Sequence, residues 1–148
     1  MSLTFRLARR EDVAAVVALM ADDRLGSQRE TTALAPYLAA FDAMLAEGAN
    51  HLYLAELDGE IVATYQITFI MGLSRRASRR AQVESVRIAS FCRNRGFGAA
   101  LMADAEARAR AAGCSLIQLT TDRTRSDAHR FYDRLGFTPS HIGYKKQL

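Results

Sequence analysis

The first half of the chain has hydrophobic positions with two different periods. Residues 3–8 alternate apolar and polar side chains, as a half-buried β-strand does, and the apolar residues of 13–20 follow at helical spacing. A second helical pattern covers residues 34–45, where Pro36 indicates the first turn and Gly48 provides a C-terminal stop. These patterns predict one strand followed by two helices.

Two further strands are predicted on either side of Asp58 and Gly59. Residues 50–57 and 60–70 are rich in apolar side chains, and an Asp-Gly pair suits the positive backbone angles of a tight hairpin turn. We therefore expect these two strands to pair in the antiparallel direction.

The second half of the chain alternates strands and helices. Strands are predicted at 81–90, 114–121 and 142–148, with helices over 101–112 and 126–135. Strands and helices mixed in this way predict an α/β (α+β) fold, with a mixed sheet and helices on its faces.

Composition is that of one ordinary globular domain. The chain has 148 residues, of which 49% are hydrophobic and 24% charged, so we expect a single domain over residues 1–148. No apolar segment resembles a signal peptide or a membrane span, which predicts a cytoplasmic protein with no membrane partner. Cys92 and Cys114 lack the close Cys and His neighbours of a metal site, so we expect free, partly buried thiols and no metal.

Arginine is unevenly distributed in a chain of net charge +4. It gathers in residues 74–80, 93–95 and 122–130, so an anionic ligand is expected. Aromatic residues do not alternate with these arginines as they do on a nucleic-acid stacking platform, which favours a small polyanion over nucleic acid. Residues 74–80 are interpreted as a solvated loop between strands.

Residues 92–102, CRNRGFGAALM, combine a glycine-rich turn with the start of a helix. Such a corner aims backbone N–H groups and the positive end of the helix dipole at one point, which suits a phosphate. A side chain at Gly96 or Gly98 would keep phosphate oxygens away from the backbone. Leu101 stands where a dinucleotide-binding fingerprint needs glycine or alanine, and the Lys of a P-loop is absent.

The spacing of Arg93, Gly96 and Gly98 resembles the acyl-CoA pyrophosphate signature R-x-x-G-x-G of the GNAT superfamily of N-acetyltransferases. A strand of the expected kind, VESVRI, precedes this loop. A later helix resembles the family motif A-x-x-F-Y-x-x-x-G-F, with Ala128, Phe131, Tyr132, Gly136 and Phe137. The resemblance covers essentially the whole chain. It implies the GNAT fold, a mixed central sheet of about six to seven strands flanked by about four helices.

Acetyl-CoA is the cosubstrate that the resemblance implies. Its pantetheine arm would lie along the strand at Val86 and Ile88, bound by their backbone groups. Many relatives carry Asn where this chain has Arg125, which either reaches a CoA phosphate or is solvated at a helix start. The pyrophosphate would be held by Arg93, Asn94, Arg95, Gly96, Phe97, Gly98 and Ala99.

Acyl transfer from a thioester to an amine needs a base for the amine and an acid for the departing thiolate. Strict alternation would place Glu84 on an apolar face with Val86 and Ile88, where a carboxylate is a stronger base, and the family places its base at this position. The alternative is a salt-bridged strand glutamate, and relatives often carry a strand bulge here that would break the alternation. The resemblance makes Tyr132 the general acid, since a phenol with a reference pKa of about 10 carries a proton at neutral pH. Its alternative is a core aromatic.

These observations predict an acetyl-CoA-dependent N-acetyltransferase in which a primary amine attacks the thioester directly. A non-catalytic acyl-CoA-binding regulatory module and a basic nucleic-acid-binding domain are the alternatives. The acceptor is an amine of a small molecule or of a protein N-terminus or lysine, and a homodimer is compatible with the sequence. In the family, residues 20–40 and 138–143 would shape the acceptor pocket, and they include Asp22, Asp23, Arg24, Arg29, Glu30, Tyr37 and His141.

Overall fold

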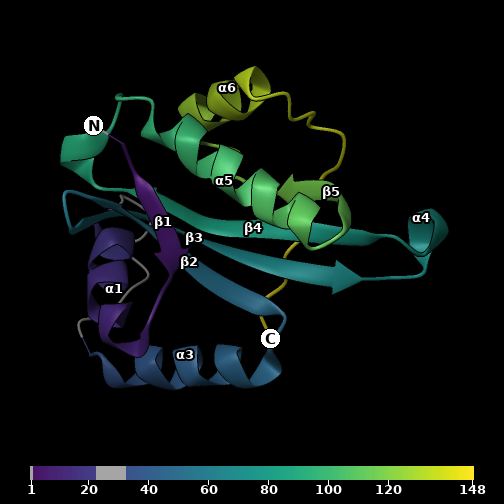
Figure 1. Ribbon diagram of the computed structural model, residues 1–148. Helices are drawn as coiled ribbons and strands as arrows, with labels where there is room; N and C mark the ends of the chain where they lie inside the picture. Colours follow the sequence, from purple (N-terminus) through teal and green to yellow (C-terminus); the bar gives the residue numbers. More distant parts are fainter. Residues whose placement is uncertain (1, 23–32) are drawn as a thin grey trace. The chain divides into compact units, whose positions relative to one another are not determined.

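The computed structural model of the protein describes residues 2–22 and 33–148 (Figure 1). The chain divides into two compact units, Met1–Gln118 and Leu119–Leu148. The first unit contains the sheet and the helices that cover it. The second consists of a helix and a C-terminal tail.

Within the described residues, a five-stranded sheet forms the frame of the first unit, with strand order β1-β2-β3-β4-β5. The first three pairings are antiparallel. Strands β4 and β5 are joined by a helical crossover, the connection that parallel neighbours require, so the sheet is mixed. The strands are β1 (Thr4–Leu7), β2 (Asn50–Leu57), β3 (Glu60–Met71), β4 (Arg79–Ile88) and β5 (Cys114–Leu119).

The expected sheet of six to seven strands is therefore too large, although the α/β architecture is confirmed. The strand predicted at 142–148 is wrong, since residues 138–148 form no strand. Ile142 and Tyr144 are exposed there, so the apolar side chains of the tail bury no face.

Helices lie on both sides of the sheet in the first unit. Figure 1 shows α1 (Val13–Ala21) and α3 (Ala35–Glu47) on one side and α5 (Phe97–Ala111) on the other. The 3₁₀ turns η1 (Arg10–Asp12) and η2 (Ser90–Cys92) precede α1 and α5. In the second unit, α6 (Ser126–Arg134) carries the predicted tyrosine helix.

Turn chemistry predicted from the sequence is confirmed at two places. Asp58 and Gly59 have φ of 52° and 82°, as the tight hairpin between β2 and β3 requires. Gly48 ends α3 with φ of 81°, a left-handed backbone that favours glycine.

The basic segment 74–80 agrees only in part with the predicted loop: residues 74–78 connect β3 to β4, whereas Arg79 and Arg80 are the first residues of β4 and pair with β3. Its first four residues make a short helical turn, α4 (Ser74–Ala77), in which Arg75 and Arg76 have φ of 53° and 62°. The sequence did not indicate this left-handed backbone, because neither residue is a glycine.

A hydrophobic cluster under α1 closes one end of the sheet. Leu19 packs there against Leu57 and Val62, together with Ala89 and the fully buried Cys92. Both cysteines are free, and burial raises the pKa of the half-buried Cys114 thiol. The expectation of free, partly buried thiols is confirmed.

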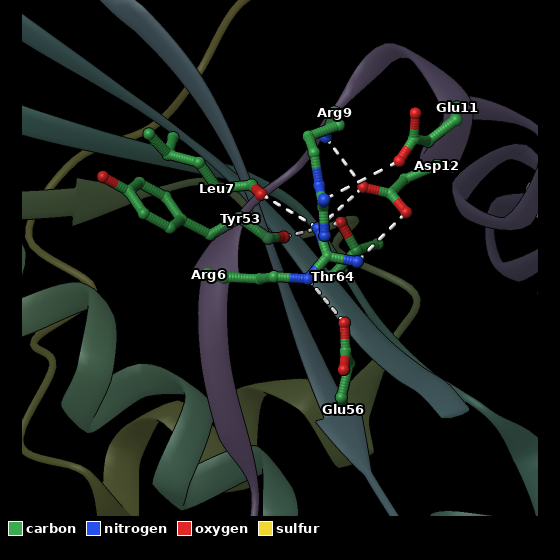
Figure 2. A network of polar contacts seen from close by, with 8 residues as sticks. All are labelled: Arg6, Leu7, Arg9, Glu11, Asp12, Tyr53, Glu56 and Thr64. Atoms are coloured by element: carbon green, nitrogen blue, oxygen red, sulfur yellow. Dashed lines mark hydrogen bonds and ion pairs between the residues drawn. The ribbon is translucent and has the colours of Figure 1, made fainter. Parts of the chain in front are cut away.

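An arginine-centred network ties β1 to the first helical turn (Figure 2). Arg6 donates from Nη1 and Nη2 to the two carboxylate oxygens of Asp12, at 2.7 and 3.1 Å, and from Nε to Glu56 on β2. The backbone N–H of Arg9 donates to the same Asp12 at 2.7 Å. Asp12 is only 7% exposed, so its charge depends on these donors.

Replacing Asp12 with Asn should lower the free energy of unfolding by about 2 kcal/mol near neutral pH, because Arg6 loses a charged acceptor at a nearly buried site. Urea denaturation measures this change. The matched control is Asp42→Asn, which removes an exposed partner of Arg10 and should cost less than about 0.5 kcal/mol.

The pH dependence of this difference tests its electrostatic origin. The hydrogen bonds from Arg6, with a smaller contribution from the Arg9 N–H, lower the pKa of Asp12 despite burial. The stabilisation is therefore complete above the unfolded value of about 4 and is lost as pH falls through the lower folded pKa. A difference between parent and variant that does not shrink on acidification would contradict this explanation.

Candidate active site

A β-bulge interrupts β4 at the centre of the candidate site. Thr64 pairs with Arg87 and Gln66 pairs with Glu84, so Ser85 and Val86 both lie opposite Tyr65 of β3. Ser85 has φ of 52°, which accommodates the extra residue. A bulge of this kind leaves backbone groups of the bulged strand outside the regular ladder, where a ligand can bind them.

The bulge overturns the expectation that Glu84 shares an apolar face with Val86 and Ile88. Glu84 pairs with Gln66, whereas Ile88 pairs with Ala63 and so lies on the opposite face. The Glu84 side chain is exposed. The strand position of Glu84 was predicted, but the expectation of strict alternation is wrong, because an extra residue of the kind found in relatives reverses the alternation.

Glu84 instead lies beside a row of polar side chains on a face of the sheet that also carries the buried Leu54 and Val62. Asn50, Thr68 and Gln82 pair across three strands on this face, and Thr68 donates to Asn50 at 3.3 Å. Gln118 of β5 extends the row by donating to Gln82 at 2.7 Å. We call these residues, with Gln66 and Glu84, the polar face. The side-chain amides and the hydroxyl of this face can donate to and accept from a polar ligand, next to the carboxylate of Glu84.

The glycine-rich loop places an open backbone corner at the start of α5. Gly96 has φ of 78°, and a Cβ on it would meet no atom within 4 Å. Residues 93–96 are exposed, and helix geometry leaves the first N–H groups of α5 without intrahelical acceptors. These features fit a phosphate group. Gly98 lies inside α5, so only a close approach by a ligand, and not a positive φ, would require glycine there.

Arg93 is engaged by the protein itself. Its Nε donates to the Ile88 carbonyl and its Nη2 to the Asp22 carbonyl, each at 3.2 Å. The Asp22 carboxylate accepts a hydrogen bond of 3.3 Å from the Ser90 N–H. Asp22, a predicted pocket residue, therefore holds the glycine-rich loop through Ser90 and Arg93. Arg95 lies over the Phe97 ring at 5.1 Å and is exposed.

Two carbonyl groups of β4, one at the bulge and one at the end of the strand, also accept hydrogen bonds from arginines. Arg87 Nη1 donates to the Val86 carbonyl at 2.9 Å, and Arg93 Nε donates to the Ile88 carbonyl. The sequence contained no signal for these contacts, since they depend on the bulged backbone. Of the predicted pocket residues, Asp23, Arg24, Arg29 and Glu30 lie outside the described residues, and Tyr37 is half-buried on α3.

In the second unit, Tyr132 lies in an aromatic cluster on α6. The centre of its ring lies 5.0 Å from that of Phe131 and 5.7 Å from that of Phe137, and both pairs are edge-on. The Phe137 N–H donates to the Tyr132 carbonyl at 3.1 Å, which closes the helix end. These contacts hold the ring in place. Arg125 caps the start of α6 without a side-chain hydrogen bond to it, and His141 is exposed and contacts Ser140.

Within the described residues, no helix is both long and apolar enough to cross a bilayer. The same part of the chain holds no group of three His, Cys, Asp or Glu side chains arranged for a metal ion.

Comparison with known proteins identifies the family. Residues 14–137 match the model of the "Acetyltransferase (GNAT) family". An aminoalkylphosphonate N-acetyltransferase of Salmonella typhimurium is 32% identical over 143 residues, which cover 97% of this chain and 90% of that protein.

Solved structures share the fold. A protein from Bacillus halodurans, described as a transcriptional regulator, is 41% identical with a TM-score of 0.94, covering 99% of this chain and 100% of that one. A structure from Clostridium acetobutylicum, described as a predicted acetyltransferase with acetyl-CoA, has a TM-score of 0.74. It is 17% identical and covers 97% of this chain and 96% of its own, so it supports the fold alone.

Proposed function

The chain belongs to the GNAT acetyltransferase family and is an N-acetyltransferase, and from this premise we propose that it uses acetyl-CoA to acetylate a primary amine. The observation that carries this proposal is the exposed backbone corner at Gly96. This corner lies between the bulged strand β4 and the start of α5. The family match spans both compact units, which supports one N-acetyltransferase domain over residues 1–148.

The cosubstrate would be held by backbone groups more than by side chains. The N–H groups at the start of α5, around Phe97, Gly98 and Ala99, would bind the pyrophosphate, with Arg95 and Asn94 exposed beside them. The pantetheine arm would follow β4 at Val86 and Ile88. Because Arg93 holds the loop to Ile88 and Asp22, its main contribution would be to the shape of the corner. Arg125 is a further candidate for a CoA phosphate.

In the proposed reaction the amine nitrogen forms a bond to the acetyl carbon and the carbon–sulfur bond breaks. Glu84 would accept the proton that the amine loses, directly or through a water, from its exposed position on the polar face. Tyr132 would donate its hydroxyl proton to the departing sulfur, with its ring held by Phe131 and Phe137. One proton leaves the amine and one reaches the thiolate, so the step balances.

The Salmonella relative suggests the acceptor class. Its name describes an amine that also carries a phosphonate, and it aligns with nearly the whole of this chain. Arg87 pairs with Thr64 on the same face as Glu84, two residues along β3 from Gln66. We propose a small zwitterionic amine, with its amine at Glu84 and its anionic group toward Arg87.

Titration calorimetry should show acetyl-CoA binding with micromolar Kd and no comparable binding of duplex DNA. Gly98→Asp should abolish that binding, because a carboxylate would stand where the pyrophosphate approaches the first turn of α5. Gly113→Asp, at a left-handed helix end away from the corner, is a control for general destabilisation. Absence of acetyl-CoA binding in the parent protein would refute the proposed function, and DNA binding would favour a regulator.

Glu84→Gln should lower turnover by roughly 10²- to 10⁴-fold and remove the acidic limb of the pH–rate profile, because amide oxygen cannot serve as the base. The Kd for acetyl-CoA should hardly change. Glu60→Gln, which alters an exposed carboxylate at the hairpin, should keep the parent profile. If the acidic limb survives in Glu84→Gln, another group is the base.

Tyr132→Phe should reduce turnover by about 10- to 10³-fold, since a thiolate needs less help from an acid than an alkoxide does. Thermal stability should change little, because the ring keeps its aromatic neighbours. Tyr144→Phe, at an exposed tail position, provides the matched control. Parental turnover in Tyr132→Phe, or loss of folding, would mean that the hydroxyl is structural.

A further inference from the structure

Tyr65 is the residue of β3 that lies opposite the bulge, between the pairs made by Thr64 and Gln66. It is completely buried, and its ring stacks on Tyr53 of β2 with 5.5 Å between centroids. A buried phenol needs a hydrogen-bond partner. The hydrogen-bond partner of Tyr65 lies on α5 and not on the sheet.

The Tyr65 hydroxyl donates to the Asp104 carboxylate of α5 at 2.6 Å. Arg108, one turn later on the same helix, donates from Nε to the same oxygen at 2.8 Å. The Arg108 guanidinium also lies 3.9 Å from the centre of the Tyr53 ring. Tyr53, Tyr65, Asp104 and Arg108 thus form a closed cluster, the tyrosine–aspartate clamp, which joins the sheet at the bulge to α5.

Directional contacts matter here because most of the packing of α5 against the sheet is apolar; besides the clamp, Arg79 of β4 donates to the carbonyl of Ala112 at the C-terminal end of the helix, at 2.8 Å. Its buried positions are Leu101, Met102, Ala105 and Ala109, which are apolar and mostly small or flexible. Burial of such a surface stabilises the packing of α5 on the sheet, but it allows the helix to slide or rotate. The hydrogen bond from Tyr65 opposes both movements at the middle of the helix, whereas Arg79 contacts only its C-terminal end. Burial raises the pKa of the Tyr65 phenol, so the hydroxyl keeps the proton that it donates.

We propose that the tyrosine–aspartate clamp sets the position of the α5 N-terminus relative to the bulge of β4, so that one acetyl-CoA molecule can bind both. This inference rests on the proposed function, in which the pyrophosphate binds at the start of α5 and the pantetheine arm binds at the bulge. The clamp residues are positioning residues and do not touch the ligand. A ligand that spans two elements gains affinity only when their spacing matches it.

The test compares a ligand that spans both elements with one that does not. Calorimetry measures the Kd of acetyl-CoA and of 3′-phosphoadenosine 5′-diphosphate, the pyrophosphate-containing fragment without a pantetheine arm. Tyr65→Phe removes the clamp hydroxyl and keeps the ring. It should weaken acetyl-CoA binding by about tenfold and change fragment binding by less than about twofold.

Thr64→Val is the matched control, because it removes a buried hydroxyl from the adjacent residue, whose bond goes to the Tyr53 carbonyl. It should leave both Kd values within about twofold of the parent. Asp104→Leu, which removes the acceptor of the Tyr65 hydroxyl, provides a second variant for the same comparison if Tyr65→Phe does not fold, and its fold is checked by circular dichroism.

The inference is overturned if acetyl-CoA binds the clamp variants as it binds the parent, or if the fragment loses as much affinity as acetyl-CoA. The second result would indicate a general loss of structure at the corner. Failure of the parent to bind acetyl-CoA would instead refute the proposed function, so the two failures are distinguishable.

Discussion

One extra residue in β4 determines the arrangement of the candidate site. The bulge at Ser85 and Val86 reverses the side-chain alternation, so that Glu84 lies on the face that carries the row of polar side chains while Ile88 lies on the other. It also concentrates backbone groups outside the regular ladder where Tyr65 stands opposite. A regular strand would place Glu84 and Ile88 on one face and leave no splayed backbone for a ligand.

Arginine has two roles in this protein. Composition alone indicates anionic ligands, but several guanidinium groups serve the fold. Arg6 holds Asp12 and Glu56, Arg93 spans Ile88 and Asp22, and Arg108 joins the clamp. Planar guanidinium groups suit this work because they donate in several fixed directions and remain charged. The candidate phosphate corner therefore depends on backbone N–H groups, with arginines shaping the loop around them.

Much of the fold could be predicted because its signals are local. The hairpin at Asp58 and Gly59 and the stop at Gly48 follow from backbone angles that few residues adopt, and both predictions are confirmed. The tail at 142–148 shows where local signals are not enough. Alternation there resembles a strand, but a strand also needs an open edge and a face to bury, and the side chains of Ile142 and Tyr144 remain exposed.

The sequence by itself determined the order of most elements, the loop with Gly96 and Gly98, and the family, since these depend on residue types at short spacing. Only the tertiary structure decided the face of Glu84, the partners of Arg93 and the clamp at Tyr65. Each of these depends on register, and register is set by pairing between strands distant in the chain. A shift of one residue leaves the sequence pattern unchanged yet moves every side chain to the opposite face.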